Sequence, residues 1–446
     1  MRVVVVGQGY VGLTAATALA ADGHEVVGVE CDPARLHALR ASVAPIYEPG
    51  LQELLTETTA LGGLTFAASV DDVAAPVDAA IVAVGTPSLP SGGADVRSVR
   101  AAIDDVAALS PLPDVVMVKS TIPPGTSADL VARAPAPAAL RARYVHSPEF
   151  LSQGTALREW RNPSRVVVGM WNHALVDPLR ELYRGVTGPW VVTTPVNAEM
   201  IKYASNAYLA THTSFANEMA NACDHVGADV DEVLLGAGLD PRIGNVWWRP
   251  GIGYGDSCLA KDTAALTFTA TVAGYPMHLL DAAQAVNVAQ RVRPVRAVRD
   301  ALEAAESAAP VAVLGLNNEP HSDDMRYAAS LVLVPELHRL ADVRVWDPLL
   351  PARDVATLFP GVTRCETVED AVAGAGVVVV LTQFDDAVRA DWAALAPTMA
   401  EPGLVLDLKN CLEPAAVMDA GLAYRGVGRS TGRAPTRRIV LPPAPV

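Results

Sequence analysis

The sequence predicts an α/β protein in which two Rossmann-like, doubly wound parallel sheets are joined by a helical central domain. Two observations support this fold class. Near both ends of the chain, short apolar runs alternate with amphipathic stretches, which is typical of parallel βαβ units. Between these regions lie long helical patterns with no strand signal.

The first alternating region contains five apolar runs that predict buried strands: Val3–Val6, Glu25–Glu30, Ala79–Val84, Val115–Lys119 and Val166–Gly169. Amphipathic stretches such as Val11–Ala21 and Val99–Ala108 lie between them and predict helices. This region, residues 1–196, is expected to be a Rossmann-like domain.

The pattern changes near Asn197. Helices are predicted over Ala198–Val226, Asp231–Ala237, Lys261–Val272 and Leu279–Leu302. Residues 197–303 are therefore expected to form a helical central domain.

Strand signals return after residue 303. Strands are predicted at Val311–Gly315, Val343–Asp347, Val377–Leu381 and Leu404–Asp407, with helices at Ala328–Ala341 and Asp385–Ala394. Residues 304–430 are expected to be a second Rossmann-like domain, and the Arg- and Pro-rich residues 431–446 a loose tail.

Bulk composition limits the class of protein. Of the 446 residues, 51% are hydrophobic and 19% charged, which favours a large core over disorder. The net charge of -15 argues against a nucleic-acid or membrane partner. The start of the chain lacks the pattern of a signal peptide, and no apolar run reaches membrane-spanning length, so a cytoplasmic protein is expected.

The five cysteines are scattered without CxxC pairs, and the nine histidines show no HExxH spacing. This sparse set fits a reducing compartment, and it predicts neither a disulfide framework nor a metal site.

A glycine-rich loop follows the first strand. Gly7, Gly9 and Gly12 form GxGxxG, with Tyr10 and Val11 between the last two glycines. The glycines allow a pyrophosphate to approach the backbone at a helix N-terminus. Glu30, at the end of the second strand, would bind both ribose hydroxyls and repel a 2′-phosphate, which favours NAD over NADP. FAD remains an alternative ligand, and Asp32 an alternative ribose-binding carboxylate.

A second glycine-rich segment precedes Cys258. The stretch Gly251–Asp262 places the thiol at the expected start of a helix, three residues before Lys261. A helix N-terminus and a nearby ammonium both favour a reactive thiolate. The alternative is a small buried hydrophobic residue, which is the expectation for Cys31, Cys223, Cys365 and Cys411.

Eight segments, in order along the chain, resemble the motifs of the UDP-glucose/GDP-mannose dehydrogenase family. They are Gly7–Leu13, Pro45–Leu51, Gly85–Pro87, Ser120–Thr126, Pro148–Leu151, Ala198–Ala210, Ser214–Glu218 and Gly251–Asp262. Motifs this numerous and this specific make coincidence improbable.

The resemblance implies that the C6 alcohol of a nucleotide sugar is oxidised to a carboxylate with two NAD per turnover. Cys258 would hold the intermediates covalently as a thiohemiacetal and then a thioester. Lys202 and Asn206, four residues apart on one helix face, would stabilise the oxyanion. Asp262 would position water with Thr121, and Glu149 would be the general base.

The resemblance also assigns roles to the domains and to single residues. Residues 1–196 would be the NAD-binding domain, residues 197–303 the dimerisation domain, and residues 304–430 the nucleotide-sugar-binding domain. Thr86, Thr121, Lys261 and Arg326 would lie near NAD, in addition to the glycine-loop residues and Glu30. The nucleotide sugar would contact Glu149, Phe150, Leu151, Lys202, Asn206, Arg242, Tyr254, Gly255, Glu319 and Lys409. Arg242 would reach into the partner subunit's substrate site, which implies a homodimer built on the helical middle.

Four positions depart from the family's usual residues. Asp256 replaces a glycine two residues before the thiol, where its charge would raise the pKa of Cys258 if the side chain pointed inward. Gln153 stands where a glutamate is common. Glu319 replaces a lysine that faces the nucleotide sugar, and Lys409 replaces an arginine that makes bidentate contacts.

These departures leave the substrate open. A UDP-glucose 6-dehydrogenase-like activity giving a uronic acid is the leading expectation. A dTDP-glucose, GDP-mannose or UDP-N-acetylhexosamine type of substrate is an alternative. The motifs are also compatible with a single-step dehydrogenase or epimerase and with a non-catalytic NAD-binding paralogue.

Overall fold

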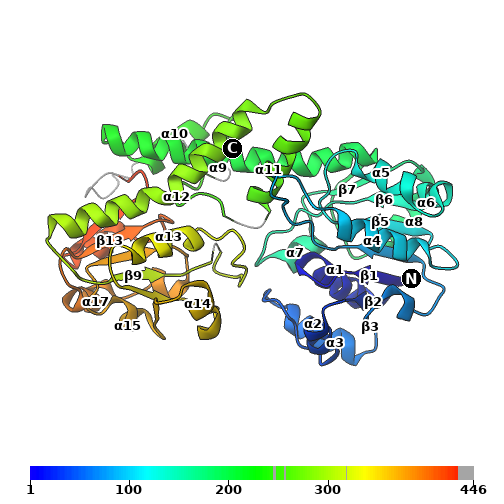
Figure 1. Cartoon of the computed structure of the whole chain (residues 1–446), viewed down its shortest axis with the longest axis horizontal. Helices are drawn as coiled ribbons and strands as arrows, with labels where there is room; N and C mark the ends of the chain where they lie inside the picture. The colour runs from blue at the N-terminus through cyan, green and yellow to red at the C-terminus, as the bar shows by residue number, and fades with distance from the viewer. Residues whose placement is uncertain (245–247, 256–257, 318, 430–446) are drawn as a thin grey trace, which may run out of the picture. The chain divides into compact units, whose positions relative to one another are not determined.

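The computed structural model describes residues 1–244, 248–255, 258–317 and 319–429 (Figure 1). The chain divides into two compact units. The first contains Met1–Tyr208, Lys261–Met277 and His321–Asp323, and the second contains Leu209–Ala260, His278–Pro320 and Asp324–Val446. The predicted tail, residues 431–446, lies outside the described residues.

The first unit is built on an eight-stranded sheet of order β3-β2-β1-β4-β5-β6-β7-β8. Its strands are β1 (Arg2–Val6), β2 (Glu25–Val29), β3 (Leu64–Ala67), β4 (Ala79–Val82), β5 (Val115–Val118), β6 (Tyr144–His146), β7 (Val166–Met170) and β8 (Trp190–Thr193). All neighbours pair in parallel except β6 and β7, which are antiparallel. The prediction of a parallel sheet therefore holds with one antiparallel pair.

Strand residues alternate between two cores on opposite faces of this sheet. Val3 and Val5 of β1 pack with Leu13 in one core, whereas Val4 and Val6 pack with Ile103 in the other. This period of two is the geometry of a strand covered on both faces, and it explains why the strands are continuous apolar runs.

The helices of the first unit fall into two layers accordingly. One face is covered by α1 (Tyr10–Ala21), α3 (Leu51–Ala60), α7 (Ala156–Arg161) and α8 (Val176–Leu182), and the other by α4 (Arg97–Ala107), α5 (Thr126–Arg133) and α6 (Pro137–Arg143). The short α2 (Pro33–Arg40) follows β2, and 3₁₀ turns lie at Val70–Asp72 and His173–Leu175.

The second unit contains a six-stranded, fully parallel sheet of order β11-β10-β9-β12-β13-β14. The strands are β9 (Val311–Leu314), β10 (Val343–Trp346), β11 (Thr363–Arg364), β12 (Val377–Val380), β13 (Leu404–Asp407) and β14 (Ala423–Gly426). One face packs against α12 (His278–Ala304) and α13 (Ser330–His338), and the other against α15 (Val368–Val372), α17 (Trp392–Leu395) and α18 (Pro414–Asp419). The remaining helices are α14 (Ala352–Leu358), α16 (Asp385–Val388) and the 3₁₀ turn Ala396–Thr398.

The helical middle of the chain consists of α9 (Pro195–Val226), α10 (Val230–Gly238), α11 (Leu259–Val272) and the start of α12. These bounds agree closely with the predicted helices. The predicted helix Asp385–Ala394 is instead two short helices, α16 and α17, because Asp391 caps the second one by accepting a hydrogen bond from the Ala394 amide at 3.2 Å.

A buried histidine ends β6 and generates a prediction about acid stability. His146 is fully buried, and burial together with the charge of Lys119 lowers its pKa from 6.5 to about 3. The folded state therefore favours neutral His146, and the unfolded chain takes up the proton first as the pH falls below 6.5. The contribution of neutral His146 to stability is therefore fully present above pH 6.5, and it is lost as the pH falls below that value.

Below pH 6.5 the free energy of unfolding should fall less steeply with decreasing pH in His146→Leu than in the unmodified chain. The slopes should differ by roughly 1 kcal/mol per pH unit. Urea denaturation at several pH values measures this slope. His173→Leu, at an exposed turn, is the matched control and should leave it unchanged. Equal slopes for all three proteins would contradict the assignment.

Candidate active site

The glycine loop between β1 and α1 is closely packed at two glycines and open at the third. Gly7 has a φ of +91°, and a Cβ on Gly12 would lie 1.8 Å from the Gly7 carbonyl oxygen, so neither position accepts a side chain. A Cβ on Gly9, by contrast, would meet nothing within 4 Å. The backbone is thus exposed at Gly9, directly before the N-terminus of α1, as the binding of a pyrophosphate requires.

Glu30 lies at the end of β2 and is buried. Its carboxylate accepts hydrogen bonds from the amides of Gln8, at 3.2 Å, and Asp32, at 2.9 Å, so it is fixed beside the glycine loop. Asp32, the alternative ribose-binding carboxylate, instead caps α2 by accepting from the Arg35 amide at 2.9 Å. Within the loop, Tyr10 donates its hydroxyl to Asp323 at 2.7 Å, and Val11 is half-buried.

A buried ion pair joins the loop after β6 to helix α9. Lys202 Nζ lies 3.1 Å from Glu149 Oε1, and the two side chains are only 4% and 8% exposed. The Leu151 amide donates to the other Glu149 oxygen at 2.6 Å, and Lys202 Nζ lies 5.4 Å from the ring centre of Phe150. Burial alone would raise the pKa of Glu149, but the charge of Lys202 and the Leu151 amide outweigh it and lower that pKa. Glu149 is therefore held as a carboxylate.

One turn further along α9, Asn206 begins a second set of polar contacts. Asn206 donates to Asp262 at 2.7 Å, and both side chains are buried. Lys261 forms an ion pair with Asp262 and donates to the hydroxyl of Thr86 at 3.4 Å. Thr86 in turn donates to the Thr121 carbonyl at 3.0 Å. Five of the predicted site residues from four segments of the first unit thus form one connected network.

Sequence reasoning missed two residues that support these groups. Lys119 is 5% exposed, and its ammonium donates to the Ser147 carbonyl at 3.0 Å and to the Tyr183 hydroxyl at 3.1 Å. Glu199 is fully buried and accepts from the amides of Gly125 and Ser127, at 2.6 and 2.7 Å. A lysine at the end of an apolar strand and a glutamate three residues before Lys202 were the available signals.

The predicted nucleophile belongs to the second unit. Cys258 is half-buried and directly precedes Leu259, the first residue of α11, so the expected helix start is correct. Asp256, whose effect on the thiol was in question, lies outside the described residues. The preceding loop is fixed by Asn287, which accepts from the Tyr254 amide and donates to the Tyr254 carbonyl, each at 2.9 Å. Gly255 is buried beside it.

Three predicted binding residues of the second unit are exposed. The Arg242 guanidinium pairs with Asp240 at 2.6 Å and has a side chain 89% exposed. Arg326 pairs with Asp324 at 2.7 Å and is also exposed. Glu319, which follows β9, is exposed as well.

Lys409 is half-buried and follows β13. Its amide donates to Asp407 at 3.1 Å, and Asp407 also accepts from Leu412 and Tyr424. Because β9 and β13 lie in one parallel sheet, Glu319 and Lys409 follow strand ends at the same edge, where ligands bind in such sheets.

Two features are absent from the part of the chain that the structure describes. No group of three or more His, Cys, Asp or Glu side chains there has the arrangement of a metal site. None of the helices found in the same residues is both long enough and apolar enough to cross a bilayer.

Comparison with known proteins finds one family whose domains match this chain. Residues 1–187, 196–289 and 312–414 match, in order, the NAD binding, central and UDP binding domains of the UDP-glucose/GDP-mannose dehydrogenase family. UDP-glucose 6-dehydrogenase YwqF of Bacillus subtilis (strain 168) is 37% identical over 435 residues, covering 96% of this chain and 98% of that protein. The UDP-glucose 6-dehydrogenase of Rhizobium meliloti (strain 1021) is 36% identical over 439 residues, covering 96% of this chain and all of that protein.

Solved structures show the same similarity. A UDP-glucose dehydrogenase from Pyrobaculum islandicum matches with a TM-score of 0.85 and 33% identity, over 96% of this chain and 98% of that one. A UDP-D-ManNAc dehydrogenase from Pyrococcus horikoshii matches with a TM-score of 0.82 and 27% identity, over 96% and 99% of the two chains. With all three domains matched along nearly its whole length, this chain belongs to the UDP-glucose/GDP-mannose dehydrogenase family.

Proposed function

We propose that this protein oxidises the C6 alcohol of a nucleotide sugar to a carboxylate, with NAD as the acceptor and Cys258 as the covalent nucleophile. The observation that carries the proposal is the buried pair of Glu149 and Lys202, because it keeps a carboxylate ionised and an ammonium fixed. Relatives named UDP-glucose 6-dehydrogenase support the reaction class.

The glycine loop fits NAD. The open backbone at Gly9 and the N-terminus of α1 would hold the pyrophosphate, and Glu30 would hold the ribose hydroxyls. Thr86 and Lys261 belong to the network described above and would line the same site, and Arg326 is a further candidate. When bound, NAD supplies the acceptor for one hydride in each oxidation.

In the proposed reaction, Cys258 holds the intermediates through two oxidations and one hydrolysis. The alcohol first loses a hydride and a proton and becomes an aldehyde. The Cys258 thiolate adds to the aldehyde carbon, and the oxygen takes up a proton to give a thiohemiacetal. Loss of a second hydride and a proton leaves a thioester. Water then adds to the thioester carbon, and the carbon–sulfur bond breaks to release the acid and the Cys258 thiol.

The network in the first unit supplies groups suited to these steps. The Lys202 ammonium and the Asn206 amide are donors for an oxyanion. Asp262, which accepts from Asn206, is suited to orient water together with Thr121. Glu149 is an ionised carboxylate suited to take a proton from water as it adds to the thioester. Phe150 and Leu151 flank it and would contact the sugar.

We further propose a cytoplasmic homodimer that uses the helical middle. Large apolar side chains are exposed on the helices of both units. In the second unit they include Val226, Leu239, Leu279 and Val288, each more than half exposed, and in the first unit Tyr208, Val272 and Tyr275. These side chains are the candidates for the interface, because contiguous exposed apolar surface marks protein–protein contacts. Arg242, which is highly exposed, would then reach the partner subunit's substrate.

The identity of the sugar nucleotide is the open part of the proposal. Tyr254, Gly255, Glu319 and Lys409 would bind it in the second unit. If Glu319 faces the nucleotide sugar, as the lysine it replaces does in the family, its carboxylate would be unfavourable beside a diphosphate, so a substrate other than UDP-glucose is the second candidate. One structural relative is named a UDP-D-ManNAc dehydrogenase, which shows that the fold serves other sugars.

Replacing the nucleophile tests the covalent mechanism. We expect Cys258→Ser to lower acid formation by on the order of 10³-fold or more. A serine hydroxyl cannot form the thiohemiacetal from which the second hydride is lost. Product analysis and NADH counting measure it, with two NADH per acid expected from the unmodified protein. Cys411→Ser is the matched control. One NADH per sugar with an aldehyde or ketone product would favour the single-step alternative, and full acid formation by Cys258→Ser would contradict the mechanism.

A substrate panel tests the specificity. Steady-state assays with NAD across UDP-, dTDP- and GDP-sugars compare the two candidates. If Glu319 has changed the substrate, a sugar nucleotide other than UDP-glucose should have the highest kcat/KM. Glu319→Lys should lower KM for UDP-glucose by about tenfold, which equals roughly 1.4 kcal/mol of favourable contact. Glu303→Lys makes the same charge change on α12 and should have no such effect. A wide preference of the unmodified protein for UDP-glucose would remove the idea of a changed substrate.

The buried lysine beneath the loop generates a pH prediction. The charge of Lys119 contributes to the lowered pKa of Glu149, so Lys119→Met should raise that pKa. The acid limb of the kcat–pH profile should therefore move to higher pH, since the base protonates earlier. Lys119→Arg keeps the charge and should leave the acid limb at the pH of the unmodified protein. Arg133→Met removes an exposed positive charge and should not move the limb either. An unchanged limb in Lys119→Met would contradict the role.

A further inference from the structure

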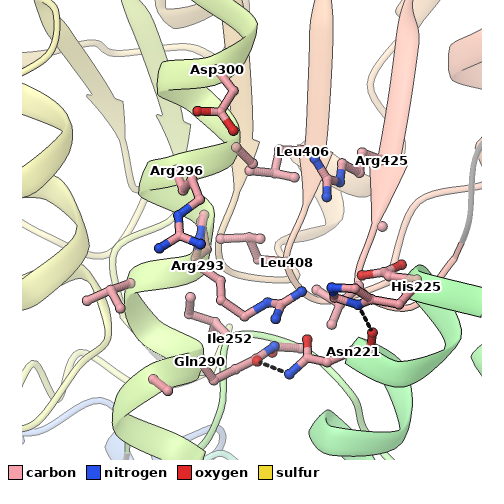
Figure 2. A pocket seen from close by; sticks show the side chains of 18 residues that line it. Asn221, His225, Ile252, Gln290, Arg293, Arg296, Asp300, Leu406, Leu408 and Arg425 are labelled. Atoms are coloured by element: carbon pink, nitrogen blue, oxygen red, sulfur yellow. Dashed lines mark hydrogen bonds between the residues drawn. The ribbon is translucent and has the colours of Figure 1, made fainter.

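A cavity of about 490 Å³ lies within the second unit, away from the residues assigned to the reaction. It is bounded by the end of α9, the second half of α12, and strands β13 and β14 (Figure 2). This volume is typical of a small-molecule site. Its lining does not include Tyr254, Gly255, Cys258, Glu319 or Lys409.

Three arginines contribute positive charge to the lining of the cavity. Arg293 and Arg296 come from α12, and Arg425 comes from β14. Figure 2 shows Arg293 extending from α12 toward the side formed by α9. None of the three has a carboxylate of the described residues within 4.0 Å, whereas Arg299, on the same helix, pairs with Asp300 at 3.5 Å.

The acidic and titratable groups around these arginines do not neutralise them. Asp224, His225 and Asp300 also line the cavity. Burial raises the pKa of Asp224, while the charges of Arg425 and Arg293 act to lower it, which shows that both arginines lie near this one carboxylate. Asp300 is shared with Arg299. The cavity lining therefore contains three exposed arginines and two carboxylates, one of which already has a partner, in a chain whose net charge is -15.

The rest of the lining fits an organic molecule with hydrogen-bonding groups. Ile252, Leu406 and Leu408 contribute apolar surface. Asn221 donates to Gln290 at 3.0 Å, and Gln290 donates to the Gly251 carbonyl at 2.7 Å. The buried Oδ1 of Asn221 has no hydrogen-bond partner among the described residues, so it is an acceptor available to a hydroxyl or amine of a ligand.

We propose that this cavity is a second ligand site, and that it binds a small organic phosphate through Arg293, Arg296 and Arg425. Guanidinium groups bind phosphate oxygens in a bidentate manner, and the apolar and amide lining would hold a hydroxylated body such as a sugar. The inference stands independently of the identity of the nucleotide-sugar substrate.

Calorimetry on the full-length protein tests the site, with ribose 5-phosphate as the probe and ribose as the uncharged control. We expect ribose 5-phosphate to bind, ribose to bind at least tenfold more weakly, and inorganic phosphate to lie between them. The double variant Arg293→Gln/Arg425→Gln should weaken ribose 5-phosphate binding at least tenfold. Arg299→Gln, on the same helix, should change it less than twofold. Binding should also weaken as salt is added.

Saturating NAD and, in a separate titration, a saturating nucleotide sugar should leave this binding in place, since neither is expected to occupy the cavity. Loss of binding under either condition would overturn the proposal and assign the probe to the reaction site. Equal binding to the double variant would also overturn it. So would absence of binding together with a change of the oligomeric mass in the double variant, which would assign the arginines to a contact between copies of the chain.

Discussion

The burial of two opposite charges, Glu149 and Lys202, is the constraint on which the proposed active site depends. Neither side chain is open to water, so each charge is tolerated only because the other lies 3.1 Å away. Removing one partner would leave a buried charge without compensation, which is far more costly than the pair itself. The pair thereby fixes the loop after β6 against α9, at two residues to which the proposed mechanism gives roles.

The same principle extends outward from this pair. Lys119 lies beneath the loop, held by a carbonyl, a hydroxyl and the rings of Trp160 and Tyr183, at 5.2 and 5.6 Å. On α9, Asn206 connects to Asp262 and so to Lys261. Each of these charged and polar groups, unfavourable if buried alone, is compensated by a neighbouring side chain or backbone group.

In the second unit, the positively charged side chains of interest lie at the sheet edge and in a cavity. Lys409 follows a strand end at the sheet edge where ligands bind, as does the unusual Glu319. The arginines of α12 and β14, by contrast, line a separate cavity on the face of the sheet. In a chain of net charge -15, these cationic side chains are candidates for binding anions at two separate places of the second unit.

The sequence by itself determined the features that depend on local pattern. Apolar runs identified most strands of both sheets, glycine spacing identified the loop at Gly7–Gly12, and the position of Cys258 before a helix followed from the residues around it. Family motifs named the polar residues of the first unit. The strands β3 and β6 were not identified. The edge strand β3 is only partly buried and carries no continuous apolar run, and β6 has only three residues.

Tertiary structure alone decided which of these residues meet. The antiparallel pairing of β6 with β7, the burial of Lys119, the capping role of Asp32 and the cavity between α12 and β14 all depend on contacts between segments or on a local choice among hydrogen bonds. Spacing along a chain records the period of a helix or strand, but it does not record which distant side chain compensates a buried charge. That compensation arises only when packing removes water from both groups.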